Sequence, residues 1–144
     1  MKRRELLAAG LLGAVHVAAA SATADELAAA ISSFSGGAPV RSGKVKLDVA
    51  PLVENGNAVP VSVSVESPMT AAEHVQAIAL FNQRNPQRDV ARFTLGPRAG
   101  RALVQTRIRL ATSQQLVAVA KLSDGTFWQH SVDVVVTLAA CVEG

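Results

Sequence analysis

Between residues 58 and 66, valine alternates with small, polar or charged residues, in the order Ala-Val-Pro-Val-Ser-Val-Ser-Val-Glu. Successive side chains of a β-strand point to opposite faces, and β-branched residues favour strands. Val59, Val61, Val63 and Val65 therefore predict a strand with one buried face. Because Pro60 has no amide hydrogen to give to a neighbouring strand, we expect this strand to lie at a sheet edge or beside a bulge.

The rest of the chain beyond residue 40 also has the pattern of short strands separated by turns. Further strands are predicted at 44–49, 75–81, 90–95, 104–110, 116–120 and 126–138. Asp124-Gly125 is a strong hairpin signal between the last two. About seven short strands with frequent turns predict an all-β fold, an immunoglobulin-like antiparallel β-sandwich. The cysteine and tryptophan pattern of antibody domains is absent from the sequence.

Two segments differ from the half-buried pattern. Residues 75–81 are apolar on both faces, as expected of a central strand or of one that faces a partner chain. Residues 25–34 place Leu27, Ile31 and Phe34 on one side, which predicts a short amphipathic N-terminal helix.

The amino terminus has the layout of a bacterial secretory signal peptide. Lys2-Arg3-Arg4 is followed by the uncharged, mostly apolar stretch 6–20 and by Ala22-Thr23-Ala24, a small-x-small cleavage signal. The stretch is too short to span a bilayer, and the arginine pair resembles a twin-arginine signal. We expect residues 1–24 to be the signal, 25–138 the sandwich domain and 139–144 a flexible tail. The exported protein would then be periplasmic, with no membrane segment.

Charge and aromatic content argue against nucleic-acid binding. The signal carries +2 of the chain's formal net charge of +3, so the exported domain is close to neutral. Its aromatic residues are four Phe and one Trp, with no Tyr, and no basic stripe has aromatics interleaved.

Cys141 is the only cysteine, and it lies three residues before the carboxyl terminus. A single thiol cannot form a disulfide within the chain, and a short tail of small residues is poorly placed to fill a core. The flanking Ala139, Ala140 and Val142 make a slender arm. From Thr137 to Cys141 an extended chain spans about 13 Å, enough to reach the active site of another protein. We interpret the tail as a carrier arm with Cys141 as its attachment point.

Other chemistries are disfavoured. His74 and His130 are expected to be solvent-facing strand residues, and with Cys141 they lack the spacing of a zinc or copper site, so no metal or other cofactor is predicted. A catalytic set of Cys141, His130 and Asp133 would need a nucleophile held within hydrogen-bond reach of its base, which a mobile tail does not provide.

The alternation at 104–110 leaves Arg107 and Arg109 together on the exposed face of its strand. The pair suits either an anion or acidic partner, or simply a solvated sheet face.

Several ordered motifs resemble the SoxY family, the sulfur-compound carrier subunit of the bacterial thiosulfate-oxidising system. They are Asn55-Gly56, Val59 to Val65, Ser67-Pro68-Met69, Asn85-Pro86, Thr106 to Ala111, Ser113-Gln114 and Asp124-Gly125. The resemblance covers nearly all of the chain after the signal and extends to its twin-arginine character. It implies a protein that is not itself an enzyme and that carries sulfur intermediates covalently on its C-terminal cysteine in the periplasm.

The resemblance also implies partners. These are a SoxZ-like subunit in a heterodimer, a sulfur transferase with c-type haem and a metal-dependent hydrolase. The family's tail is usually Gly-Gly-Cys-Gly-Gly, whereas here alanines precede Cys141, and Val142, Glu143 and Gly144 follow it. Alanine restricts the backbone more than glycine does. Glu143 and the terminal carboxylate place two negative charges near the thiol, which favours its protonated form and slows attack by the thiolate.

A second interpretation stays open from the sequence alone. The chain would then be a periplasmic immunoglobulin-like binding or assembly module whose cysteine carries nothing.

Overall fold

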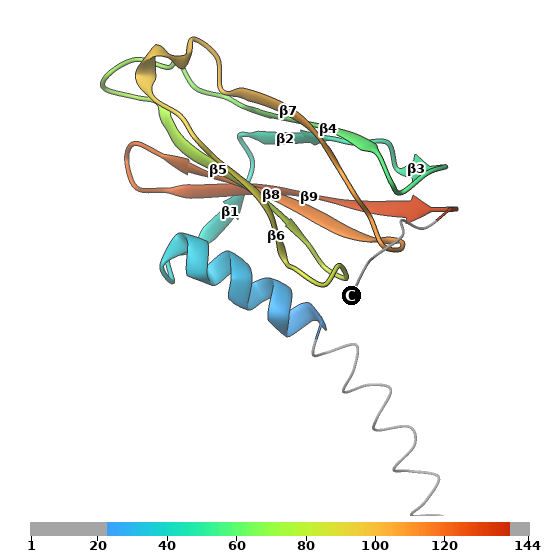
Figure 1. Cartoon of the computed structure of the whole chain (residues 1–144). Helices are drawn as coiled ribbons and strands as arrows, with labels where there is room; N and C mark the ends of the chain where they lie inside the picture. The colour runs from blue at the N-terminus through green and yellow to red at the C-terminus, as the bar shows by residue number, and fades with distance from the viewer. Residues whose placement is uncertain (1–22, 139–144) are drawn as a thin grey trace, which may run out of the picture.

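The computed structural model describes residues 23–138, so most of the expected signal and the whole expected tail lie outside the described residues (Figure 1). A helix at residues 23–35 is followed by two facing sheets. Within the described residues the strands are β1 (Val40–Ser42), β2 (Val45–Asp48), β3 (Leu52–Val53), β4 (Val59–Val65), β5 (Val75–Asn82), β6 (Asp89–Thr94), β7 (Leu103–Ile108), β8 (Gln114–Leu122) and β9 (Phe127–Val136). One sheet has the order β1-β9-β8-β5-β6, with β3 also paired to β9, and the other has the order β2-β4-β7. The predicted immunoglobulin-like β-sandwich is confirmed.

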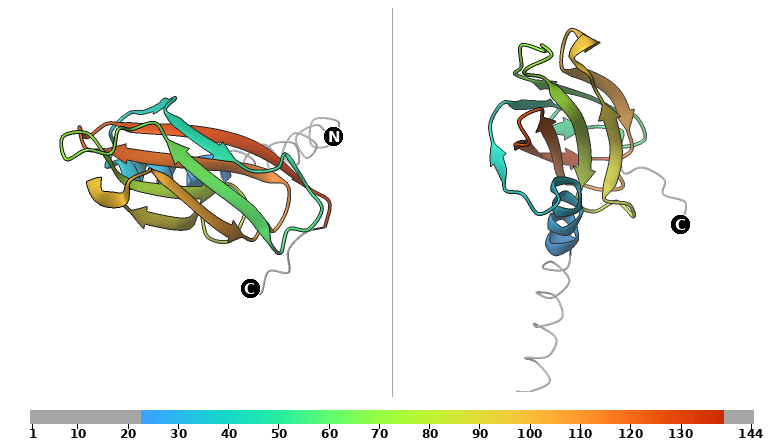
Figure 2. Two further views of the ribbon diagram at one scale, coloured as in Figure 1. Left: turned by 90° about the horizontal axis from the view of Figure 1, so that it is seen from above. Right: turned by 90° about the vertical axis from the view of Figure 1, so that its left-hand side faces the viewer.

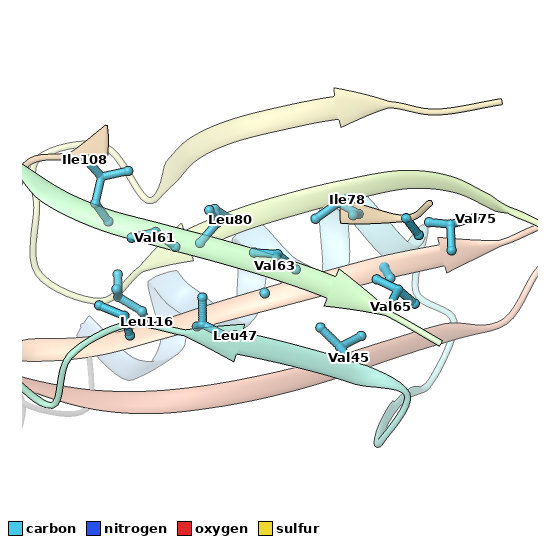
Figure 3. Close-up of a cluster of buried hydrophobic side chains, with 14 of the residues drawn as sticks. Val45, Leu47, Val61, Val63, Val65, Val75, Ile78, Leu80, Ile108 and Leu116 are labelled. Carbon is cyan, nitrogen blue, oxygen red and sulfur yellow. The ribbon is translucent and has the colours of Figure 1, made fainter. Parts of the chain in front are cut away.

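The valine alternation of β4 provides one wall of the main core. Val59, Val61, Val63 and Val65 are all buried, at 0% to 8% exposure, and face the larger sheet (Figure 3). Ile78 and Leu80 of β5 meet them from that sheet, both at 0% exposure. Each such side chain stabilises the fold by about 1.5–3 kcal/mol through removal of apolar surface from water.

The expectation that β4 lies at an edge or beside a bulge is wrong. β4 is the middle strand of its sheet, between β2 and β7, and its register with both is regular. Pro60 is tolerated because β2 pairs with β4 only as far as Ser62. The Val65 amide bonds to the Ala102 carbonyl, so in this antiparallel pair Pro60 turns its nitrogen away from β7, towards the side that β2 has already left.

β5 is apolar on both faces because both of its faces are covered. It lies between β8 and β6, and it is confirmed as a central strand. Ala79 and Phe81 point away from the main core into a second cluster with Leu27 of the helix. The partly buried Ile31 and Phe34 pack against the same cluster, so the predicted amphipathic helix covers the outer face of the larger sheet. The alternative that β5 faces a partner chain is therefore wrong for its buried side chains.

β1 and β3 were not expected from the sequence. They are three and two residues long, too short to show an alternation, and both run parallel to β9. The chain leaves the smaller sheet after β2 and joins the larger one at β3, which closes that side of the sandwich.

The hairpin at Asp124-Gly125 is confirmed, since β8 and β9 pair in antiparallel register on either side of it. Asp124 accepts hydrogen bonds from the amide and hydroxyl of Thr126, at 2.9 and 2.6 Å. These bonds hold the pKa of the Asp124 carboxyl below its usual value of 3.8. Gly125 has a φ of 84°, a conformation that side chains other than glycine's rarely adopt.

Candidate functional site at the root of the tail

Cys141 and the arm residues Ala139, Ala140 and Val142 lie outside the described residues. The structure describes the segment that precedes the expected tail. Residues 134–138, together with residues 51–56 around β3 and the loop 109–113, are here called the tail root. This segment lies at one end of the sandwich, where β9 finishes next to β3 (Figure 1). In the described part of the chain, no helix is long and apolar enough to cross a membrane.

Backbone hydrogen bonds fix the chain up to Leu138, two residues past the end of β9. Val135 donates to the Pro51 carbonyl at 2.8 Å, and Thr137 donates to the Val53 carbonyl at 2.9 Å. The Leu138 carbonyl then accepts from Gly56 at 2.8 Å. Because β3 pairs with β9 in this way, the last described residues are tied to a loop more than eighty residues earlier in the sequence.

Ser113 continues the ladder where β8 has ended. The last β8–β9 pair is Gln114 with Val134, so the next amide of β9 that faces β8, that of Val136, has no strand partner on that side. The Ser113 hydroxyl accepts that amide hydrogen at 2.8 Å. An unpaired amide at this position would otherwise cost free energy wherever water is excluded.

A polar network braces the loops around the tail root. The Asn85 side chain accepts from the Ala111 amide at 3.0 Å and from Gln114 Nε2 at 2.7 Å, and it donates to the Arg109 carbonyl at 2.8 Å. Gln114 is only 5% exposed, and its Oε1 accepts the Arg84 amide hydrogen at 2.9 Å. The β5–β6 and β7–β8 loops are thereby held together by satisfied, partly buried amides. The Asn85-Pro86 and Ser113-Gln114 motifs supply most of these contacts.

Apolar side chains are exposed at the tail root. Leu52 and Val135 are cross-strand neighbours with exposed fractions of 60% and 53%, and Leu138 has 61%. Exposed apolar groups that cluster in this way are typical of surfaces that meet another protein.

The histidines play structural roles. His130 is an exposed residue of β9, as expected, and its Nδ1 accepts the amide hydrogen of Leu47 at 2.9 Å. The expectation is wrong for His74, which precedes β5 and is half-buried. Its Nδ1 lies 3.1 Å from the Thr70 carbonyl. Within residues 23–138, no three His, Cys, Asp or Glu side chains gather as a metal site. Whether Cys141 approaches His130 or Asp133 is not described.

Arg107 and Arg109 are exposed and alternate with the buried Ile108 and Leu110, as the pattern predicts. The basic region extends further along the chain than the pair Arg107 and Arg109. In the sequence, this basic region is marked by residues 84–109, which hold seven arginines and a single acidic residue, Asp89.

Replacing Ser113 with alanine tests the tail root. We expect a loss of about 1 kcal/mol in the free energy of unfolding, since the Val136 amide loses its acceptor. Hydrogen exchange of that amide should accelerate about fivefold or more. The matched control is Ser123→Ala, because the Ser123 hydroxyl accepts the His74 amide hydrogen at 3.0 Å in the same kind of bond. Equal exchange at Val136 in both variants would contradict the role assigned to Ser113.

The two sheets and the covering helix define an immunoglobulin-like domain in which backbone hydrogen bonds hold the chain in place as far as Leu138. The family model "Sulfur oxidation protein SoxY" matches residues 31–141, most of the chain. The chain belongs to the SoxY family. No curated protein matches the sequence.

Among solved structures, the chain is similar to the sulfur carrier protein SoxY from Chlorobium limicola f thiosulfatophilum. The identity is 28% and the TM-score 0.68, covering 80% of this chain and 99% of that one. It also resembles superoxide reductase (neelaredoxin) from Ignicoccus hospitalis, with 21% identity and a TM-score of 0.58 over 66% of this chain and 81% of that one. The superoxide reductase from Nanoarchaeum equitans has 11% identity and a TM-score of 0.56, over 67% and 100% of the two chains. The likeness to the reductases shows the fold alone.

Proposed function

We propose that the protein is a covalent carrier of sulfur intermediates in periplasmic thiosulfate or sulfur oxidation, with Cys141 as the attachment point. The observation that carries the proposal is that the match to the SoxY family runs as far as residue 141, the position of the chain's only cysteine. The solved relative with 28% identity is described as a sulfur carrier protein.

The geometry of the tail root supports this role. The Leu138 carbonyl is bonded to Gly56, and Cys141 follows three residues later. At roughly 3.3 Å per residue, the thiol therefore lies within about 10 Å of an anchored point. If a partner protein binds at the tail root, the thiol can enter a shallow channel of that partner while the sandwich stays outside the channel.

The oxidation and hydrolysis of the bound sulfur group need reactive groups that partner proteins would supply. Joining thiosulfate to a thiol forms a sulfur–sulfur bond and releases a proton and two electrons, so the step needs an electron acceptor. A sulfur transferase with c-type haem suits that step, and a metal-dependent hydrolase suits release of the sulfonate group as sulfate. A SoxZ-like subunit would complete the carrier as a heterodimer. The protein itself is then not an enzyme, and residues 1–24 direct it to the periplasm by the twin-arginine route.

The acidic tail sets a condition on these partners. The Glu143 carboxylate opposes both the approach of an anionic sulfur substrate and the formation of the thiolate. A partner channel lined with positive charge would offset both effects, because electrostatic interactions strengthen where water is excluded.

The mass of the protein purified from periplasm tests the proposal directly. We expect heterogeneous adducts that reductant removes and that peptide mapping places on the C-terminal fragment containing Cys141. The control is protein that is reduced and alkylated with iodoacetamide before exposure to thiosulfate and the pathway enzymes, since a blocked thiol accepts no adduct. A clean, unmodified thiol after exposure to thiosulfate and the pathway enzymes would favour the binding or assembly module instead.

A further inference from the structure

The outer edge of β7 has unpaired backbone groups. Because Val65 bonds to Ala102, the even-numbered residues of β7 direct their backbone groups to β4, and Leu103, Gln105 and Arg107 direct theirs the other way. β7 ends its sheet, and no strand of residues 23–138 pairs with that edge. These three residues therefore present a row of free N–H and C=O groups, which is a template for another strand.

The opposite edge of the same sheet is closed. β2 directs the amides of Val45 and Leu47 away from β4, and both have acceptors within the domain. Val45 donates to the Gly43 carbonyl at 2.7 Å, and Leu47 donates to His130 Nδ1 at 2.9 Å. Among the described residues, the outward amides along β2 are therefore occupied, whereas those along β7 are not.

This open edge lies in the most basic part of the chain. The arginines of the segment 84–109 are Arg84, Arg88, Arg92, Arg98, Arg101, Arg107 and Arg109. Arg88 pairs with Glu26 and Arg92 with Asp89, whereas the other five are exposed and form no ion pair among the described residues. β6 ends the larger sheet on the same side of the sandwich as β7 (Figure 2), but its one arginine, Arg92, lies over the Phe34 ring of the helix. The basic residues along the β7 edge are therefore Arg101, Arg107 and Arg109.

The side chains of β7 give this edge a pattern. Leu103, Gln105 and Arg107 share the outer face of the strand, and Arg101 before it and Arg109 after it are exposed in the same alternation. Leu103 is 40% exposed. Beside Gln105 and Arg107 the sheet face is hollowed, and the other sides of the hollow are lined by Asp48, Val49, Ala50, Pro60, Val61 and Ser62. The hollow has a volume of about 570 Å³.

We propose that β7 is a docking edge, to which an acidic extended segment of a partner protein adds as a fourth strand. Backbone bonds to Leu103, Gln105 and Arg107 supply affinity, and alternate side chains supply specificity. The segment that fits has an apolar residue beside Leu103 and carboxylates beside Arg107 and Arg109. A second copy of this chain is disfavoured at the edge, because its β7 would bring arginines against arginines. The inference is independent of the carrier function.

The test uses the exported chain and two synthetic peptides. Each has valine at the position that faces Leu103, and the positions four and six residues along, which face Arg107 and Arg109, are glutamates in one peptide and lysines in the other. Amide exchange and chemical shifts are followed by NMR. The acidic peptide should bind and slow exchange at Leu103, Gln105 and Arg107, and the basic peptide should not bind. Gln105→Pro removes one edge donor without touching the β4 ladder, and edge positions tolerate proline. We expect it to weaken binding about tenfold, whereas Gln105→Ala changes the affinity less than about twofold.

Charge reversal provides a second, independent variant. R107E combined with R109E should weaken acidic-peptide binding about tenfold or more, and the matched pair K46E with K121E should leave it within about twofold. Unaltered exchange at the three β7 amides while the peptide binds would overturn the proposal. Equally tight binding of polyphosphate that Gln105→Pro leaves unchanged would also overturn it, since the surface would then attract any polyanion.

Discussion

Replacing Cys141 with serine is expected to abolish thiosulfate oxidation in a system reconstituted with the pathway enzymes. Serine preserves the size of the side chain, but a hydroxyl is protonated at neutral pH and does not form the sulfur–sulfur bond that a thiolate forms. Since residue 141 is the only cysteine, no other thiol of the chain replaces it. The readout is the rate of electron release from thiosulfate, which should fall to the level without carrier.

The fold and the partner contacts should survive this substitution. Cysteine and serine are nearly equal in size, and the buried side chains of the two clusters come from residues 27–134, so the free energy of unfolding is expected to change by less than about 0.5 kcal/mol. Val142→Gly is the matched control, because it alters the tail next to the thiol and brings it closer to the glycine-rich form. That variant should keep or raise the rate. Activity that persists in Cys141→Ser would rule out the carrier function and leave the binding or assembly module.

The sequence predicts this fold well where alternation is long. β4 shows its pattern over seven residues, and the β8–β9 hairpin is marked by Asp124-Gly125. The short β1 and β3 could not be predicted, because both depend on pairing with β9 far along the chain. Pro60 led to the wrong prediction that β4 lies at an edge or beside a bulge, for a related reason. Whether a proline is tolerated depends on where the neighbouring strand ends, and β2 ends through tertiary contacts that no local pattern encodes.

In the candidate site, too, the sequence indicates some residues but not the contacts that position them. Residue type and position single out Cys141, but nothing local indicates that Gly56 anchors Leu138 or that Ser113 completes the ladder at Val136. These contacts join segments about eighty and about twenty residues apart. The sequence marks the basic segment 84–109 by its seven arginines and single acidic residue, but it does not show that this segment borders a free sheet edge. The free edge depends on β7 being the last strand of its sheet, which is a property of the topology.

Replacing Phe81 with alanine is expected to cost about 3–5 kcal/mol in the free energy of unfolding. Phe81 is 0% exposed and lies in the second cluster, between the larger sheet and the helix. Its ring meets that of Phe34 edge to face, with centroids 6.1 Å apart. Small domains have a total stability of about 5–15 kcal/mol, so this one change removes a large part of it. Urea denaturation followed by circular dichroism gives the difference.

The matched variant is Phe34→Ala, which removes the other ring of the pair from the helix side. Phe34 is only partly buried and also contacts Phe127, at a centroid distance of 5.7 Å. We expect it to cost about 1–2 kcal/mol, because solvent and neighbouring side chains fill an exposed gap more easily than a closed one. Phe81 anchors β5 in the sheet, whereas Phe34 holds the helix onto that sheet. If the two substitutions cost equally little, the helix does not cover the sheet in solution, and the outer faces of β5 and β8 are open to a partner after all.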